Sequence, residues 1–130
     1  MKAKILLILA TLAIAGLVGC QNATSTTTNN DTTDPIVGTW TFVSSTSANG
    51  TITSAADQHK SAELTFKKDN TVTYSLTDSH GPSTTVCSWT KSGSAYQMTT
   101  PYGTVIALTL SGNTLTKKNA ADSGFDTFTK

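Results

Sequence analysis

The feature that most constrains the fold is an alternation of apolar and polar residues with a period of two, repeated in short runs across residues 36–130. Leu64 and Phe66 flank a threonine, and Ile106 and Leu108 flank an alanine in the same way. Successive side chains of a β-strand point to opposite faces, so such runs predict strands with one buried face. Turn-forming residues separate the runs, and together they predict about eight or nine short strands joined mostly by hairpins.

Hairpins place successive strands side by side, so the expected strand order is up-and-down and antiparallel. An open sheet of this many twisted strands would expose two edges, and closure into a barrel removes both. We therefore predict an all-β domain over residues 35–130, a small up-and-down antiparallel β-barrel of about eight strands, with a two-sheet sandwich as the alternative. The best helix candidate, Ser54 to Ala62, carries too little apolar surface to support a helix.

Composition narrows the class of function. Charged residues make up 13% of the chain and the formal net charge is +1, which excludes a nucleic-acid-binding protein that works by neutralising phosphates. Every basic residue is a lysine, so the bidentate clamps that arginine forms with carboxylates or phosphates are unavailable. Threonine makes up about a fifth of the chain, which favours strands.

The sequence contains no recognisable catalytic motif. It has neither a Gly-x-Ser-x-Gly nucleophile turn nor a phosphate-binding glycine loop. Glu63 is the only glutamate, and the aspartates are scattered, mostly at expected turns, so no pair of catalytic carboxylates is indicated. We predict a protein that is not an enzyme and needs no cofactor.

Two histidines and a cysteine are candidate metal ligands. His59 and His80 each follow an aspartate by two residues, and on strands these side chains could form a site with Cys87. Both histidines fall in segments that predict loops, so we interpret them as surface turn residues and predict no metal. Cys87 is interpreted as a buried small apolar residue, with a reactive thiol or an intermolecular disulfide as the alternatives.

The first residues resemble an export signal. Lys2 and Lys4 precede an apolar run, Ile5 to Leu17, that is shorter than a membrane-spanning helix requires. The run ends in Leu17-Val18-Gly19-Cys20, which resembles the bacterial lipobox. The resemblance implies removal of residues 1–19 as a lipoprotein signal peptide and attachment of diacylglycerol to Cys20. A short membrane-anchor helix that ends at an incidental cysteine is the alternative.

The composition of residues 20–34 predicts a disordered tether between the membrane anchor and the barrel. After Cys20 the segment contains no apolar residue larger than alanine, so it cannot bury enough surface to order itself, and we expect it to be disordered. Without Lys2 and Lys4 the chain has seven lysines against eight acidic residues, a net charge of −1, so its attachment to the membrane must be covalent. By resemblance to enterobacterial lipoproteins, glutamine rather than aspartate at position 21 favours the outer over the inner membrane. The expected location is extracytoplasmic, in the bacterial cell envelope.

A second resemblance concerns the barrel. Gly38-Thr39-Trp40 resembles the Gly-x-Trp signature of lipocalin and calycin barrels, and residues 64–73 are similar to the central hairpin of small bacterial lipocalin-like domains. The resemblance implies that Trp40 plugs the closed end of the barrel. In those proteins an arginine stacks on this tryptophan; this chain has no arginine, and Lys117 or Lys118 is the expected weaker substitute.

The expected function is binding of a small hydrophobic molecule inside the barrel, with the hydroxyl groups of Tyr74 and Tyr96 orienting it. An eight-stranded barrel admits one small ligand or is filled by its own side chains. The alternative is therefore a packed core made of the same residues, in a structural or interaction module that offers its outer face or loops to another envelope protein. The predicted inward-facing residues are Phe66, Val72, Tyr74, Trp89, Tyr96, Met98, Ile106 and Leu108.

Overall fold

The computed structural model describes residues 33–119 and 123–130, which belong to one compact unit. The predicted signal peptide, the predicted lipidation site Cys20 and almost all of the predicted tether lie outside the described residues. Within the described ranges no helix is long and apolar enough to cross a membrane. The strands are β1 (Gly38–Thr46), β2 (Ile52–Ser54), β3 (Ser61–Phe66), β4 (Thr71–Asp78), β5 (Gly81–Ser92), β6 (Ala95–Thr99), β7 (Val105–Ser111), β8 (Thr114–Lys118) and β9 (Phe125–Thr129).

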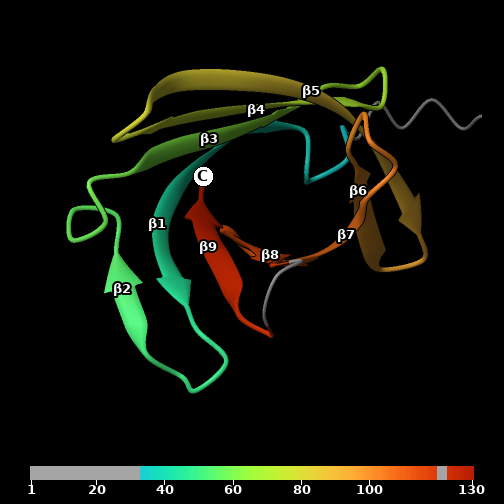
Figure 1. Cartoon of the computed structure of the whole chain (residues 1–130). Helices are drawn as coiled ribbons and strands as arrows, with labels where there is room; N and C mark the ends of the chain where they lie inside the picture. Colours follow the sequence, from blue (N-terminus) through green and yellow to red (C-terminus); the bar gives the residue numbers. More distant parts are fainter. Residues whose placement is uncertain (1–32, 120–122) are drawn as a thin grey trace, which may run out of the picture. The chain divides into compact units, whose positions relative to one another are not determined.

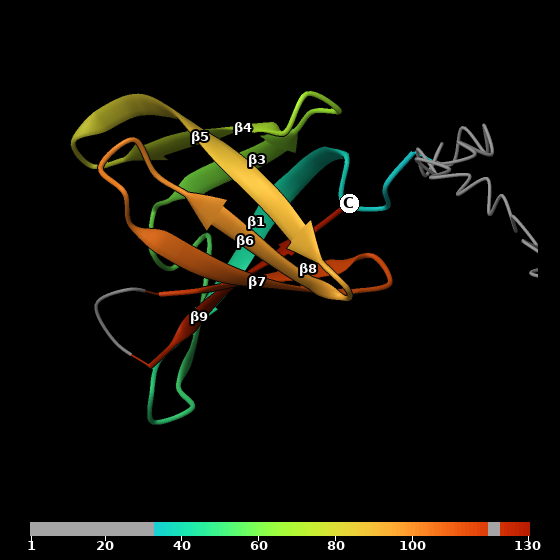
Figure 2. The same ribbon diagram turned by 90° about the vertical axis from the view of Figure 1, so that its right-hand side faces the viewer.

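The strands form an antiparallel barrel, as the alternation predicts. The sheet order is β2-β1-β3-β4-β5-β6-β7-β8-β9, and an additional pairing between β1 and β9 closes the ring. Figure 1 looks into this ring, which passes from β1 through the layer of β3, β4 and β5 to β6 and β7 and returns through β8 and β9. The view turned by 90° shows β5, β6 and β7 crossing the face of the barrel obliquely (Figure 2). Eight strands close the barrel, and β2 is a short ninth strand attached to β1.

β1 changes partner along its length. Its first half pairs with β3, from Gly38 opposite Phe66 to Thr41 opposite Glu63, and its second half pairs with β2. On the other edge, the register with β9 shifts between Phe42 and Ser44, which marks a β-bulge. The extra residue reverses the alternation of β1 beyond this point.

The alternating apolar residues fill the closed half of the barrel. Phe42 and Phe128 meet edge to face, and so do Phe66 and Trp89. Aromatic rings in this arrangement bury large areas and add a favourable electrostatic contact. The buried core consists of Ile36, Trp40, Phe42, Ala62, Leu64, Phe66, Val72, Cys87, Trp89, Tyr96, Met98, Leu108, Leu115 and Phe128.

Trp40 lies at the closed end and is fastened there from two sides. Its indole N–H donates a hydrogen bond to the carbonyl oxygen of Ile36 at 2.7 Å, so the segment before β1 folds over the ring. The cation above the ring belongs to Lys130, whose Nζ lies 5.2 Å from the ring centroid. The expectation of Lys117 or Lys118 in this place is wrong, because Lys117 points into the barrel and Lys118 is exposed.

The turns form at the turn residues that the sequence indicates. The residues from Ser54 to Ala62 form no helix; they end β2, make a turn over residues 55–59 and begin β3. Asn70 closes the β3–β4 hairpin with a positive φ of 65°, a conformation that asparagine tolerates. Phe125 and Phe128 point to opposite faces of β9, with Phe128 buried and Phe125 exposed, which explains why their spacing fits no single strand face.

Candidate ligand site at the barrel mouth

The barrel has a closed end around Trp40 and a mouth at the opposite end of the strands. Of the predicted inward-facing residues, six are buried in the core: Phe66, Val72, Trp89, Tyr96, Met98 and Leu108. Tyr74 and Ile106 are only half-buried, and both pack against that core. All eight residues therefore face inward, but only the last two retain accessible surface that a ligand could cover.

The mouth combines an apolar wall with charged groups. Leu76 joins Tyr74 and Ile106 as a half-buried apolar residue packed against the core. Lys117 and Asp126 are the buried charged residues among those that the structure describes. We call Ser45, Lys60, Tyr74, Lys117 and Asp126 the mouth cluster.

Asp126 is the centre of the mouth cluster. It stands opposite Ser45 on β1 and opposite Lys117 on β8, so both neighbouring strands direct a polar group at it. The Ser45 hydroxyl donates a 2.6 Å hydrogen bond to Oδ1, and Lys117 Nζ lies 2.9 Å from Oδ2. The bulge in β1 makes this possible, because without the extra residue Ser45 would face outward.

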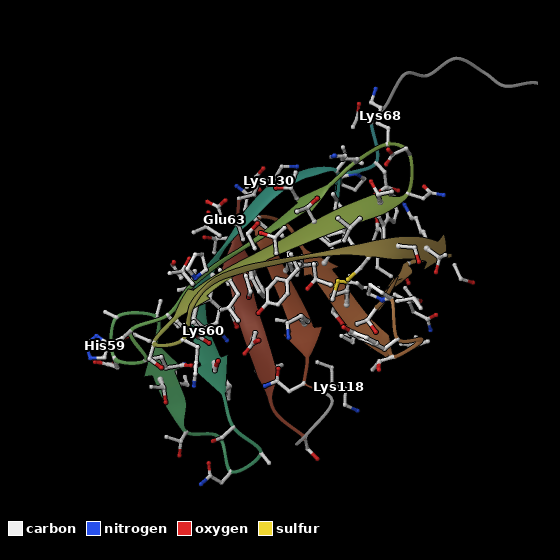
Figure 3. All side chains as sticks on the ribbon, turned by 45° about the horizontal axis from the view of Figure 1, so that its top comes forward. His59, Lys60, Glu63, Lys68, Lys118 and Lys130 are labelled. Carbon is white, nitrogen blue, oxygen red and sulfur yellow. The ribbon has the colours of Figure 1, made fainter. Side chains whose placement is uncertain are left out.

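Lys60 reaches the same carboxylate from the turn before β3. Its Nζ lies 3.9 Å from Asp126 Oδ2 and 4.6 Å from the centroid of the Phe42 ring. The first distance is that of an ion pair without a hydrogen bond, and the second is a cation–π contact. Figure 3 shows Lys60 beside the turn that carries His59, at the end of the barrel away from Lys68.

The local electrostatics fix the protonation of two groups. Burial by itself would raise the pKa of Asp126, but hydrogen bonds from Ser45 and Lys117 and the charges of Lys117 and Lys60 outweigh it and hold this pKa below its ordinary value. Burial, with the negative charges of Asp126 and Asp78, raises the pKa of Tyr74 to about 12. At neutral pH Asp126 is therefore ionised and Tyr74 keeps its proton as a hydrogen-bond donor.

The two tyrosines that were expected to orient a ligand have different surroundings. The Tyr74 hydroxyl belongs to the mouth cluster and has no hydrogen-bond partner among the described residues. The Tyr96 hydroxyl instead donates to Oδ1 of Asp34 at 2.7 Å, while Lys91 Nζ lies 2.8 Å from Oδ2 of the same carboxylate. Tyr96 thus holds the segment before β1 through this hydrogen bond. The expectation that its hydroxyl orients a ligand inside the barrel is therefore not met.

The remaining candidates are apart from the mouth cluster. His59 lies in the turn between β2 and β3, and His80 is at the tip of the β4–β5 hairpin; both are exposed, as expected of turn residues. Cys87 is buried among apolar side chains, and burial raises the pKa of its thiol, which makes it a weaker nucleophile. In the described ranges there is no group of three or more histidine, cysteine or acidic side chains that could hold a metal ion.

Sequence reasoning missed Ser45, Lys60 and Asp126. Asp126 lies two residues from Phe128, the spacing of one strand face, but a carboxylate at such a position is ordinarily read as outward. The bulge that turns Ser45 inward has no clear signature in Phe42-Val43-Ser44-Ser45. The sequence offered one signal for this site: the inward positions 45 and 126 carry the polar residues Ser45 and Asp126 in place of apolar ones.

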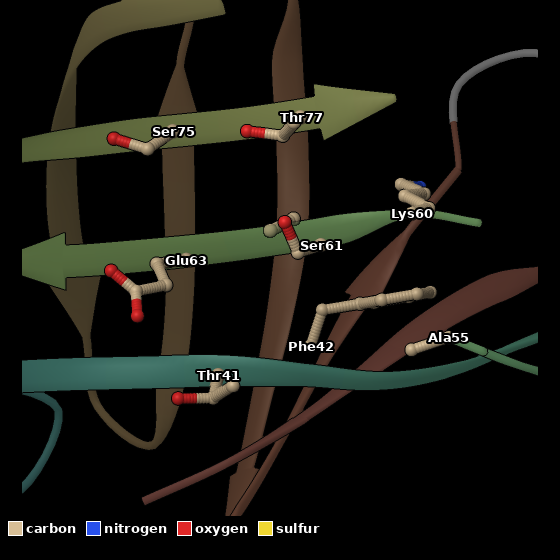
Figure 4. Close-up of a pocket in the computed structure, with 9 residues that line it drawn as sticks. Thr41, Phe42, Ala55, Lys60, Ser61, Glu63, Ser75 and Thr77 are labelled. Atoms are coloured by element: carbon tan, nitrogen blue, oxygen red, sulfur yellow. The ribbon is translucent and has the colours of Figure 1, made fainter. Parts of the chain in front are cut away.

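Three hollows in the described structure open on the outer surface, with volumes of about 220, 230 and 370 Å³. None of these three is lined by the eight predicted interior residues. The first lies where β1 leaves β3, and Phe42 and Lys60 form part of its lining (Figure 4).

Comparison with known proteins identifies the fold. A search of curated proteins finds no match. A lipocalin-like protein from Bacteroides uniformis has a similar crystal structure, with a TM-score of 0.55 and 16% sequence identity over 72% of this chain and 96% of that chain. The sequence pattern of the lipocalin-like domain family, whose members are typically non-enzymatic binding proteins, matches residues 36–117. These residues include the Gly-x-Trp segment, six of the eight barrel strands in full and β8 except for its last residue. The chain belongs to the lipocalin-like domain family.

Proposed function

We propose that this protein is a lipid-anchored protein of the bacterial cell envelope whose barrel binds a small hydrophobic molecule at its mouth. The observation that carries the proposal is the half-buried apolar wall of Tyr74, Leu76 and Ile106, which packs against the core yet stays accessible. Small-molecule sites are typically apolar, with a few polar groups that fix the orientation of the ligand. The mouth cluster supplies such groups beside the wall.

We expect Ile106→Asp to weaken binding of a hydrophobic fluorescent probe at least tenfold, because a carboxylate on the apolar wall must lose its hydration when the probe binds. Val105→Asp is the matched control: Val105 is the preceding residue of β7 and faces outward with 57% of its surface exposed. The measurement is a fluorescence titration of the folded proteins. Equal affinities of the two variants would contradict a site at the mouth, and absence of saturable binding to the unmodified protein would overturn the proposed function.

The anchor is proposed on the lipobox-like segment that ends at Cys20. We expect the protein made in a bacterial host to appear in the membrane fraction, with the mass of the chain from residue 20 plus its acyl groups. Several acyl chains hold a protein on a bilayer far more firmly than one. Cys20→Ser should abolish both the added mass and the membrane association, whereas Cys87→Ser should change neither. A Cys20→Ser protein that kept the lipid mass would contradict the anchor.

A second candidate is an interaction module with a filled barrel. It is favoured by the burial of Phe66, Trp89 and Met98, whose side chains occupy the core of the barrel. Apolar side chains are also exposed outside the barrel, among them Tyr102, of which 93% of the surface is accessible. Saturable probe binding that depends on Ile106 favours the ligand-binding function, and its absence favours the interaction module.

A further inference from the structure

We propose that the closed end of the barrel lies on an anionic lipid bilayer and that the mouth faces the aqueous phase. The inference rests on the lipid anchor of the proposed function and goes beyond it, because an anchor holds a protein at a membrane without deciding which of its faces contacts the lipid. Two observations carry it: the place where the chain enters the barrel, and the distribution of charge between the two ends.

The chain enters the barrel at the closed end and is fixed there. The Asp34 carboxylate accepts hydrogen bonds from the Tyr96 hydroxyl at 2.7 Å and from Lys91 Nζ at 2.8 Å. Lys130 Nζ donates a 2.6 Å hydrogen bond to the carbonyl oxygen of Val37. These contacts hold the residues before β1 against the closed end. The proposed anchor is therefore joined to the barrel at this end and not at the mouth.

The connection between the anchor and the barrel is short. Residues 21–33 separate Cys20 from Asp34. A fully extended chain of this length spans about 50 Å, and a random coil of the same length spans about 20 Å. The closed end therefore stays near the bilayer. Because the anchor already supplies the attachment, a modest difference in charge between the two ends is enough to orient the barrel.

The closed end is positively charged. Among the described residues it carries four exposed lysines against the aspartates Asp34 and Asp69, a net charge of +2. Asp34 forms an ion pair with Lys91, so Asp69 alone opposes the other three lysines. Figure 3 shows Lys68 and His59 at opposite ends of the barrel. The four lysines are Lys67 and Lys68 between β3 and β4, Lys91 near the end of β5, and Lys130 after β9.

The turn between β3 and β4 presents its lysines in a fixed position. The carbonyl oxygen of Lys67 accepts a 3.0 Å hydrogen bond from the indole N–H of Trp89, and the carbonyl oxygen of Asn70 accepts one of 2.8 Å from the backbone N–H of Trp89. The Asp69 carboxylate accepts hydrogen bonds from the backbone N–H and the hydroxyl of Thr71. The core thus holds this turn in place while its lysine side chains extend into solvent.

The rest of the barrel has no excess of positive charge. An anionic leaflet attracts basic groups, and the attraction falls off within about one Debye length, about 10 Å at 0.1 M salt. The closed end is therefore attracted to the lipid and the remainder of the barrel is not. The remaining charged residues of the described ranges, with a net charge of −1, are Lys60, Lys117, Lys118, Asp57, Glu63, Asp78 and Asp126.

This orientation determines how a ligand reaches the mouth. The half-buried apolar wall at Leu76 and Ile106 lies at the end of the barrel away from the bilayer. The ligand of the proposed function therefore enters from the aqueous phase and not directly from the lipid around the anchor.

The test measures resonance energy transfer from a fluorophore on the acylated full-length protein to rhodamine-labelled lipid, in vesicles that contain about one-third anionic phosphatidylglycerol. Cys87→Ser is the background, so the fluorophore reacts with one introduced cysteine. Ser94→Cys places it at the closed end, between β5 and β6, and Tyr102→Cys places it at the mouth, between β6 and β7. β6 separates the two positions by up to about 20 Å, so we expect about twofold more transfer from the Ser94→Cys label.

Charge variants test the cause of the orientation. Lys67→Ser combined with Lys68→Ser removes two positive charges from the closed end and should make the transfer from the two labels equal. Lys118→Glu changes the net charge by the same amount at an exposed position at the end of β8, and it should preserve the difference. Salt at about 0.5 M, where the Debye length is about 4 Å, should reduce the difference, and so should vesicles of neutral phosphatidylcholine.

The outcomes separate the inference from the function on which it rests. Equal transfer from the two labels on anionic vesicles, or more transfer from the Tyr102→Cys label, would overturn the inference and leave the anchor intact. A difference that persists at high salt in the folded variant lacking Lys67 and Lys68 would overturn the role of these lysines. A mass spectrum without acyl groups would overturn the proposed anchor, and the inference with it.

Discussion

Asp126→Ala is expected to lower the free energy of unfolding by about 3 to 5 kcal/mol, the typical result of removing one partner from a buried ion pair. Asp126 is 4% exposed, and its carboxylate is the closest negative charge to the buried ammonium group of Lys117. Without it, Lys117 keeps a buried charge and Ser45 loses the acceptor of its hydroxyl. The measurement is urea unfolding at neutral pH, followed by tryptophan fluorescence.

Two variants test whether the loss comes from the buried charge. Asp57→Ala, in the exposed turn between β2 and β3, removes the same charge from the surface and should change stability by less than about 0.5 kcal/mol. The double variant Lys117→Met with Asp126→Leu removes both charges and should recover most of the loss, because apolar residues of similar volume replace the pair. A double variant as unstable as Asp126→Ala would contradict the importance of the unpaired Lys117 charge.

The contribution of Asp126 should also depend on pH in a defined direction. The pKa of Asp126 is held below its ordinary value in the folded protein, so ionisation of this group stabilises the fold at every pH above about 4. As the pH falls from there toward the lowered native pKa, this contribution is lost. The difference in stability between the unmodified protein and Asp126→Asn should therefore be largest at neutral pH and shrink below about pH 4. Asp34, whose pKa is also lowered, affects both proteins equally and cancels.

The barrel could be predicted from the sequence because its inward positions carry their own signal. Trp40 and Phe42, Tyr96 and Met98, and Ile106 and Leu108 each alternate with small or polar residues, and each pair faces inward. Period-two alternation determines which face is buried, and the turns determine which strands are neighbours. These two signals were sufficient for an up-and-down closed barrel.

The mouth could not be predicted because its inner positions are occupied by polar residues. Phe125 and Phe128 leave the inner face of β9 undetermined, since the residue that alternates with Phe128 is Asp126. A buried carboxylate is recognised only once its partners are known, and Ser45 and Lys60 lie far from it in sequence. The same limit applies to Lys130, which takes the place over Trp40 expected of Lys117 or Lys118 because the C-terminus of β9 returns to the start of β1.

Trp40→Ala is expected to lower the free energy of unfolding by about 4 kcal/mol, in the range for removing a large aromatic side chain from a core. Trp40 is among the largest fully buried side chains, and three contributions are lost with it. The core gains a cavity, the buried carbonyl of Ile36 loses its indole donor, and Lys130 loses the ring beneath its ammonium group. For a domain of this size the loss corresponds to a decrease of about 20 °C in the melting temperature, measured by circular dichroism.

Trp40→Phe separates these contributions, because it keeps an aromatic ring for the core and for Lys130 but leaves the Ile36 carbonyl without its donor. The expected loss is about half that of Trp40→Ala, since an unsatisfied buried polar group costs about 1 to 3 kcal/mol. Tyr102→Ala removes an aromatic side chain that is 93% exposed and should leave the melting temperature nearly unchanged. If Trp40→Phe is as stable as the unmodified protein, the hydrogen bond to Ile36 contributes nothing, and the segment before β1 must be held by Asp34, Lys91 and Tyr96 instead.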